Sequence, residues 1–283
     1  MIRVVLLLGF LTAILLGIGF VIGGFFGMTL ALIFAVLINF LSYWYSDRIV
    51  IRIYQAKPTD NRKLNDMVDR LSVEAKIPKP RVYLVPNDVP NAFATGRNPQ
   101  KAVVAVTEGL MNLDDDEIEG VLAHEIAHIS NNDTMISAVA ATIAGAISYI
   151  AQIGYWSMFL GSGRRGEGSV LGLILIIIFA PLAAVLVKLA ISRVEEYKAD
   201  FTGATLTKKP GSLASALKKI SEIARENPMK GSAATSHMWI VNPFKDDWFT
   251  GLFSTHPPIA RRVKILRKMS HKGVAEYEYQ DMT

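Results

Sequence analysis

The sequence predicts a mostly α-helical membrane protein, with about four transmembrane helices and a cytoplasmic α+β domain that contains a small sheet. Three observations support this fold class. Hydrophobic residues make up 51% of the 283-residue chain and charged residues only 19%, a balance that is unusual for a soluble protein. Long uncharged segments occur in two regions of the chain. Charged segments between and after them have the periodicities of amphipathic helices and short strands.

The first uncharged segment, residues 4–46, is long enough for two membrane spans of about 20 residues each. The Gly-Gly pair that starts at Gly23, together with Gly27, marks the expected turn. With Gly19 these glycines recur every four residues, which either allows close helix packing or merely marks the bend. A cleaved signal peptide is the alternative. A single basic residue at the start and no clear cleavage site favour a retained hairpin, residues 1–46.

A second apolar hairpin is expected at residues 136–190. Its spans are residues 136–160 and 170–187, and Pro181 in the second is tolerated where neighbouring helices satisfy the freed carbonyl. The basic segment after the first hairpin is expected to face the cytoplasm under the positive-inside rule, together with the N-terminus. That segment contains Arg48, Arg52, Lys57, Arg62 and Lys63.

The remaining chain is expected to form one domain in two parts, residues 47–135 and 191–283. The net charge of the whole chain, +5, fits contact with anionic lipid, whereas no basic stripe or stacking platform suggests nucleic-acid binding. The absence of cysteine excludes disulfides and thiolate metal ligands.

Within the first part, residues 60–75 have the apolar spacing of an amphipathic helix, and short strands are expected at residues 81–86, 91–96 and 101–107. One of these strands contains four small or apolar residues that would let an extended substrate peptide approach: Asn91, Ala92, Phe93 and Ala94. If this strand is an exposed sheet edge, it can pair with substrate backbone, although an ordinary hairpin strand is equally consistent.

The chemically most informative motif is His-Glu-x-x-His at residues 124–128. His124 and His128 lie four residues apart, so a helix places both imidazoles on one face, where they can bind one zinc ion at about 2.0–2.1 Å each. Glu125 can then act as a general base on a water that the metal activates. Asp114 and Glu117 have the spacing of a capping box at the start of this helix. The pattern is typical of metal-dependent peptide hydrolysis.

A zinc ion held by two histidines needs a third protein ligand, and the fourth position is left for water. Thr134 stands where a third histidine would follow, and Asp133 is too close in sequence to reach back easily. Glu196 and Asp200 lie four residues apart after the second hairpin, so they share a helical face. One of them could bind zinc while the other orients an imidazole, but spacing alone equally allows a polar helix with solvated charges.

The chain resembles the HtpX-type membrane zinc endopeptidases, which are relatives of the CAAX prenyl proteases. The similarity runs through nearly the whole length, including both hairpins, the metal motif, residues 91–96 and 102–110, and Glu-Tyr-Lys-Ala-Asp at 196–200. It implies a zincin-like (gluzincin) domain with one zinc ion, Glu196 rather than Glu195 as the third ligand, and Asp200 in an outer position. It also implies that His256, in Thr-His-Pro, stabilises the oxyanion.

The same resemblance implies a multi-pass protein of the bacterial or archaeal plasma membrane that cleaves misfolded or damaged membrane proteins, or unfolded polypeptides, at the cytoplasmic face in quality control and stress response. Two alternatives stay open. One is a membrane scaffold or chaperone with a structural zinc, and the other is a narrow-specificity processing protease. The oligomeric state and the role of residues 227–255 are not determined by the sequence.

Overall fold

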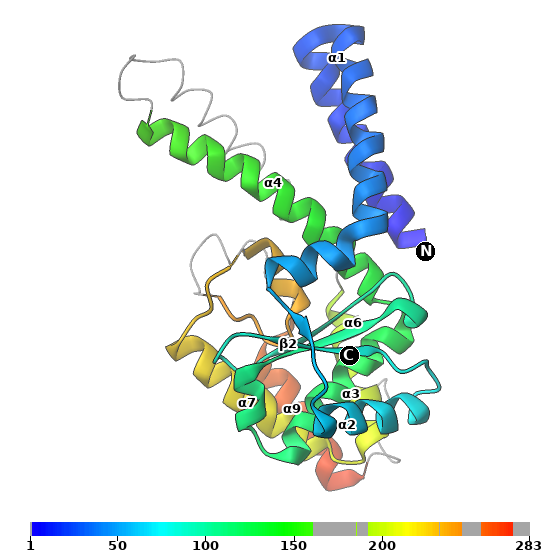
Figure 1. Cartoon of the computed structure of the whole chain (residues 1–283), viewed down its shortest axis with the longest axis vertical. Helices are drawn as coiled ribbons and strands as arrows, with labels where there is room; N and C mark the ends of the chain where they lie inside the picture. The colour runs from blue at the N-terminus through cyan, green and yellow to red at the C-terminus, as the bar shows by residue number, and fades with distance from the viewer. Residues whose placement is uncertain (1, 161–184, 186–191, 232, 245–255, 274–283) are drawn as a thin grey trace.

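The computed structural model describes residues 2–160, 185, 192–231, 233–244 and 256–273. A long helical hairpin stands above a domain in which helices surround a small sheet (Figure 1). The elements are α1 (Ile2–Ile53), β1 (Lys57–Pro58), α2 (Arg62–Glu74), β2 (Arg81–Val85), β3 (Ala92–Thr95), η1 (Pro99–Lys101), β4 (Val103–Thr107), η2 (Glu108–Asn112), α3 (Asp115–Asn131), α4 (Thr134–Leu160), α6 (Arg193–Thr207), α7 (Pro210–Glu226), η3 (Ala233–Met238) and α9 (Ile259–Lys272).

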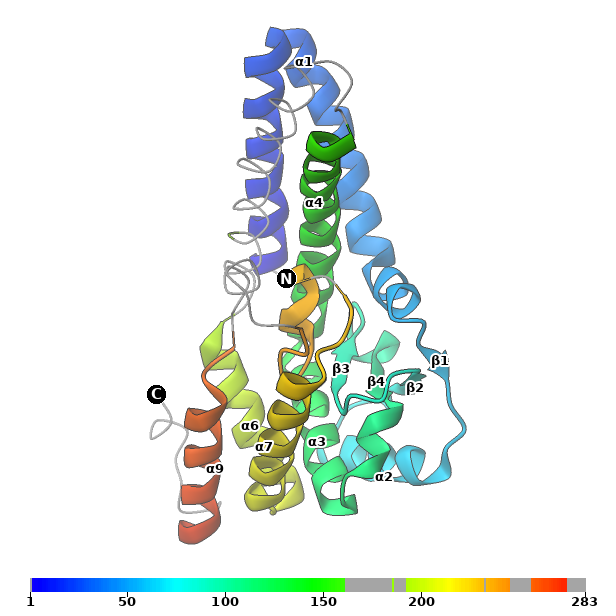
Figure 2. The ribbon, with the colours of Figure 1, turned by 90° about the vertical axis from the view of Figure 1, so that its left-hand side faces the viewer.

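Helix α1 consists of two antiparallel legs that meet at a break (Figure 2). The backbone of Gly23 and Gly24 is not helical there, and Gly24 has φ +58°, a conformation that glycine adopts without strain. The legs approach closely just below the turn, where a Cβ on Gly19 would lie 2.6 Å from the carbonyl oxygen of Gly27. The glycines therefore form the bend and also permit close packing.

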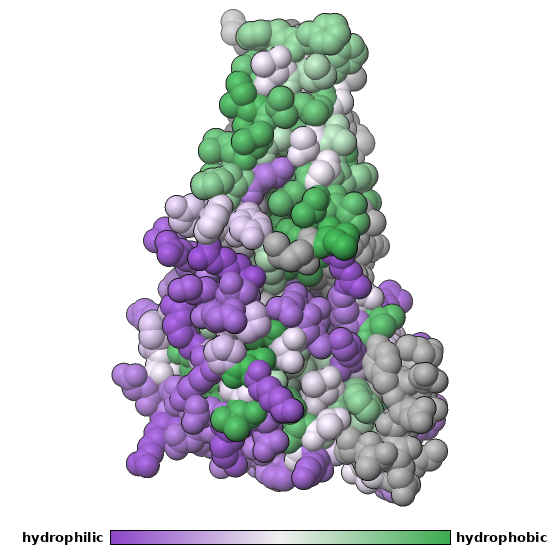
Figure 3. All heavy atoms as spheres, turned by 90° about the vertical axis from the view of Figure 1, so that its right-hand side faces the viewer, coloured by the Kyte–Doolittle hydropathy of each residue, from purple (hydrophilic) through white to green (hydrophobic). Residues whose placement is uncertain are grey.

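The two legs of α1, Ile2–Phe20 and Gly23–Ile53, are long and apolar enough to cross a membrane. Large apolar side chains point outward from them, as at Phe25 and Phe26, which are 76% and 74% exposed. Figure 3 shows the resulting hydrophobic surface above a mostly hydrophilic domain. Because exposure of so much apolar surface to water is unfavourable, these legs belong in lipid.

The second predicted hairpin is only partly described. Its first span corresponds to α4, whose early residues pack against the first leg of α1. This contact joins Val4, Leu7 and Leu11 to Ile136, Val139 and Ile143. The other predicted span, residues 170–187, lies outside the described residues apart from Val185, so the expected total of four spans stays a prediction.

The sheet has the strand order β1-β2-β4-β3. Strands β2 and β4 are parallel, with Arg81 opposite Val103, whereas β1 and β3 are antiparallel to their neighbours. The strands predicted at residues 81–86, 91–96 and 101–107 are confirmed as β2, β3 and β4.

Strand β3 is an edge strand, but it is not exposed, so of the two alternatives the exposed edge does not hold. All its residues are buried, and Phe93 is completely inaccessible. The segment after η3 covers the edge, because the Ile240 N–H donates to the Ala92 carbonyl at 3.0 Å and the Asn91 side chain donates to the Val241 carbonyl at 2.9 Å. A substrate strand therefore cannot pair along the whole of β3.

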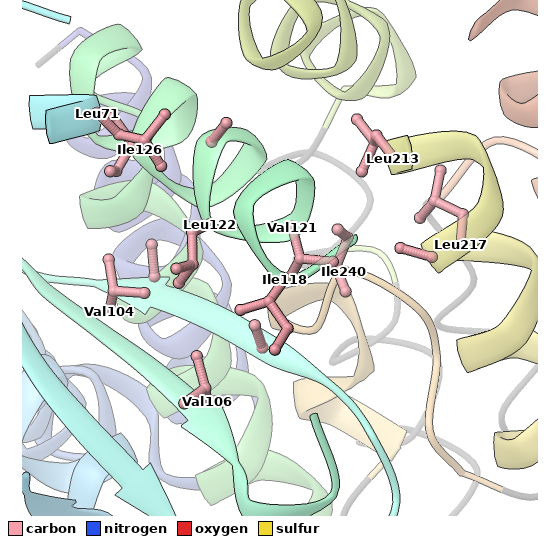
Figure 4. Packing of buried hydrophobic residues seen from close by; sticks show 14 of the residues in the cluster. Leu71, Val104, Val106, Ile118, Val121, Leu122, Ile126, Leu213, Leu217 and Ile240 are labelled. Carbon is pink, nitrogen blue, oxygen red and sulfur yellow. The ribbon is translucent and has the colours of Figure 1, made fainter. Parts of the chain in front are cut away.

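Helix α3 lies at the centre of the domain core. Figure 4 shows Ile118 and Leu122 of α3 between Val104 of β4 on one side and Leu213 and Leu217 of α7 on the other. All five side chains are buried to 1% exposure or less. The sheet, α6 and α7 all pack on α3. The backbone of α3 is therefore held rigidly, and so are the positions of the side chains on the face of the helix that remains uncovered.

Candidate metal centre

Helix α3 presents the two motif histidines on one face. The predicted capping box is confirmed, with Asp114 and Glu117 bonding each other's backbone at the helix start, and Asn132 ends the helix in the left-handed region. One turn apart on this helix, His124 and His128 have their Nε2 atoms 3.2 Å from each other. Two ring nitrogens therefore face a common point.

Helix α6 brings a carboxylate to the same point. The two helices approach closely at Gly203, where a Cβ would lie only 3.0 Å from the backbone nitrogen of His124. Glu196 then reaches both rings, with Oε1 3.5 Å from His128 Nε2 and Oε2 3.8 Å from His124 Nε2. The neighbouring Glu195 instead forms an ion pair with Arg3 of α1.

The three side chains fit a zinc ion. One ligand atom from each of His124, His128 and Glu196 lies within 4.8 Å of the others. Tetrahedral zinc with bonds of about 2.0–2.1 Å separates its ligands by about 3.3–3.4 Å, close to the observed 3.2 and 3.5 Å. Two imidazole nitrogens and one carboxylate oxygen are also the donor set of many catalytic zinc sites.

Outer carboxylates orient both imidazoles. Asp200 lies 3.0 Å from His124 Nδ1, and Asp133 lies 3.5 Å from His128 Nδ1. A carboxylate on Nδ1 favours a proton there and leaves Nε2 available to a metal. Asp133 therefore lies on the far side of the His128 ring, away from the point where the ligand atoms meet.

Arg262 of α9 connects these groups, although its place in the sequence did not mark it as a site residue. It is 0% exposed, and it donates to both Asp200 oxygens at 2.8 and 2.7 Å and to the Ile240 carbonyl at 2.9 Å. Its Nη1 atom is 3.4 Å from Glu196 Oε2. A signal was present, because Arg262 shares the helical spacing of Leu266 and Met269, both fully buried.

A cleft opens beside the ligand atoms. It is lined by Ala94 of β3, by the start of α4, by the segment that includes Trp239, and by two further histidines. His256 places Nδ1 3.0 Å from Glu196 Oε2. His237 is 4% exposed and donates from Nε2 to the Ser137 carbonyl at 3.1 Å, a position that nothing in the sequence pattern indicated.

Glu125 points into the same cleft and is almost completely buried. Burial and the negative charge of Glu196 raise the pKa of its carboxyl to about 7, against the opposing effects of His128 and of a hydrogen bond from the Ala94 backbone. A carboxyl with this pKa can both take up and release a proton near neutral pH.

Two of the three ligand side chains, His124 and Glu196, are held in the charge state that a metal requires. Burial lowers the pKa of His124 to about 4, in spite of Asp200. Burial alone would raise the pKa of Glu196, but His256, Arg262 and His128 keep it well below its usual range. For His128, burial is outweighed by the Asp133 hydrogen bond and by nearby carboxylates, which raise its pKa to about 9 in the metal-free chain. Metal and proton therefore compete for His128.

A zincin-type ligand set with an adjacent buried glutamate, on a domain below two apolar helices, defines a membrane metallopeptidase. The sequence profile of Peptidase family M48 matches residues 58–270, and the chain belongs to that family.

Two proteins of similar sequence agree with this assignment. A "Protease HtpX homolog" of Pyrococcus furiosus is 52% identical over 276 residues, covering 95% of this chain and 96% of that protein. A "Protease HtpX homolog" of Desulforapulum autotrophicum is 48% identical and covers 96% and 91%. The crystal structure of S. mikatae Ste24p superposes with a TM-score of 0.47 at 20% identity. The alignment covers 91% of this chain and 62% of the Ste24p chain.

Proposed function

We propose that the chain is a zinc-dependent endopeptidase that cleaves misfolded or damaged membrane proteins, or unfolded polypeptides, at the cytoplasmic face of the plasma membrane. The observation that carries this proposal is the convergence of His124, His128 and Glu196 on one point, with the Glu125 carboxyl in the same cleft. The cleft also includes the start of α4, which packs against the membrane hairpin. A membrane-bound substrate would therefore meet the cleft close to the bilayer.

His124, His128 and Glu196 would hold the zinc ion. When bound, zinc supplies a Lewis acid that polarises the scissile carbonyl and lowers the pKa of water. Glu125 accepts the proton from the attacking water and returns it to the leaving amine. The Ala94 backbone lies close enough to favour the charged form of the Glu125 carboxyl.

The surrounding residues would position the substrate. His256 lies in the cleft next to Glu196, where its imidazole can stabilise negative charge on the substrate carbonyl oxygen. Of the predicted substrate strand, Asn91 and Ala92 bond to the segment after η3, and Phe93 is packed in the core. Ala94 lines the cleft, so we assign the contact with substrate backbone to this end of β3.

Cytoplasmic orientation is supported by the basic residues in the last turns of the second leg of α1, including Arg48 and Arg52. A scaffold with a structural zinc would need four protein ligands, whereas the cluster found among the described residues contains three. Three protein ligands leave the fourth coordination position open for water, as in catalytic zinc sites.

The test uses the full chain in detergent, with bound zinc measured by elemental analysis and cleavage followed on an unfolded membrane protein. Glu125→Gln should keep its zinc and lose at least about a hundredfold in cleavage rate, because the base is gone and the ligands remain. Glu226→Gln, an exposed position on α7, is the matched control.

Cleavage by Glu125→Gln at the wild-type rate would show that the assigned base is wrong. If the wild type binds one zinc ion per chain but cleaves no substrate, whether or not 1,10-phenanthroline is present, the scaffold alternative is favoured. Cleavage of a single anchored substrate would favour a processing enzyme. Reconstitution in vesicles of known orientation, with substrate on one side only, tests the cytoplasmic assignment.

A further inference from the structure

A second hollow, of about 1220 Å³, lies apart from the metal cleft and shares no lining residue with it. We refer to it as the basic groove. The end of α1, strands β1 and β2, and the segment around η1 form its walls. Its basic lining residues are Arg48, Arg52, Lys57, Lys79, Arg81, Arg97 and Lys101, against a single acidic one, Asp47.

The positive charge of the basic groove is largely uncompensated. Lys79 lies 3.8 Å from the Asp69 carboxylate. Within the part of the chain that the structure describes, the other six basic side chains have no carboxylate within 4.0 Å. Like charges gathered around one hollow repel each other, and an anionic ligand relieves this repulsion. The groove therefore suits a negatively charged group.

Aromatic side chains from the second leg of α1 line the same groove. Phe40, Trp44 and Tyr45 are 54%, 45% and 41% exposed. The Arg97 guanidinium lies 4.7 Å from the Trp44 ring centroid, and Arg48 lies 5.6 Å from that of Tyr45. Tryptophan and tyrosine concentrate at the depth of lipid headgroups, where their rings contact both acyl chains and polar groups.

The order of residues along this leg matches the layers of a bilayer surface. An uncharged apolar helix comes first, the aromatic residues follow, and the basic residues Arg48 and Arg52 come last. Basic pockets next to transmembrane helices bind anionic lipid headgroups by this arrangement. A soluble anion would explain the positive charges but not the exposed aromatic side chains beside them.

We propose that the basic groove binds an anionic glycerophospholipid. Its phosphate would be held by the basic side chains, and its acyl chains would lie along Phe40 and the apolar surface of α1. Because β1 and β2 belong to the sheet of the peptidase domain, a lipid bound here would attach that domain to the bilayer surface at a second place besides the hairpin.

The test uses the full-length, zinc-loaded chain in neutral detergent, with bound lipids counted by native mass spectrometry. Phosphatidylglycerol and phosphatidylcholine with identical acyl chains are compared. The groove variant carries Arg52→Gln, Arg81→Gln and Lys101→Gln, which remove charge from three walls of the groove. We expect its affinity for phosphatidylglycerol to fall at least about tenfold and its affinity for phosphatidylcholine to stay unchanged.

The control variant loses the same charge from exposed positions on α9, whose later turns lie at the end of the domain away from the hairpin (Figure 2). Its substitutions are Lys264→Gln, Arg267→Gln and Lys268→Gln. It should bind phosphatidylglycerol like the wild type. Equal losses in both variants would show that only the overall charge matters and would overturn the proposal, as would wild-type binding by the groove variant.

A further arm separates a lipid from a soluble phosphate. If sn-glycerol 3-phosphate binds as tightly as phosphatidylglycerol and shows the same loss in the groove variant, the acyl chains contribute nothing and the lipid assignment is wrong. Bound zinc and the thermal unfolding midpoint, measured on every variant, show that the fold is retained.

Discussion

Replacement of Arg262 by methionine tests whether the buried charge network beside the metal centre stabilises the folded domain. Arg262 makes two hydrogen bonds to Asp200 and one to the Ile240 carbonyl, all shorter than 3 Å, from a completely buried position. Removal of one partner of such a pair leaves the other charge buried and uncompensated, at a cost of about 3–5 kcal/mol. A domain of this size loses about 2–4 °C of melting temperature per kcal/mol, so we expect a fall of roughly 6–20 °C.

The assay is thermal unfolding of the EDTA-treated chain in detergent, with Arg267→Met, an exposed position on the same helix, as control. The control should change the stability by less than about 0.5 kcal/mol. A double variant that adds Asp200→Asn should recover part of the loss, with a coupling of about 1–3 kcal/mol. The reasoning is refuted if Arg262→Met melts like the control, or if the effects of Arg262→Met and Asp200→Asn simply add.

Three further predictions concern the metal site. Glu196→Ala should lose bound zinc, measured by elemental analysis after dialysis, and full occupancy would mean that the third ligand is elsewhere. Gly203→Val should weaken zinc binding and cost about 1–3 kcal/mol, because its side chain would push α6 away from the His124 backbone. Gly211→Ala, whose Cβ would meet only a serine side chain, is the control, and equal effects would contradict this account. The folded-state pKa of Glu125 is raised from 4.5 to about 7, so its contribution to the stability of the metal-free chain is present below pH 4.5 and lost as pH rises through 7. The difference in unfolding midpoint between the wild type and Glu125→Gln should therefore decrease as pH rises over this range. A difference that increases with pH would show that the pKa of Glu125 is lowered on folding.

Local features of the fold could be read from the sequence because they depend on neighbouring residues. The capping box at Asp114 and Glu117 set the start of α3, and the spacing of apolar residues indicated α2 and the three longer strands. The Gly23-Gly24 turn followed from the ability of glycine to adopt a positive φ. The burial of β3 could not be predicted, because the segment that covers it lies about 150 residues further along the chain.

The candidate site also contains residues whose positions follow from local spacing and residues whose positions do not. His124, Glu125 and His128 lie within one helical turn, so their relative positions follow from helix geometry once the helix is recognised. The choice between Glu195, Glu196 and Asp200 did not follow from spacing. It depends on how α6 crosses α3.

The sequence by itself determined the chemistry: two imidazoles and a carboxyl base on one helix, and an apolar hairpin to hold them at a bilayer, because both follow from short-range periodicity. Only the tertiary structure decided which distant groups complete the centre. The close approach of α6 at Gly203 selects Glu196 and Asp200, and the packing of α9 buries Arg262 between them. These contacts join residues 62 or more positions apart, and such pairings depend on the packing of whole helices rather than on any local pattern.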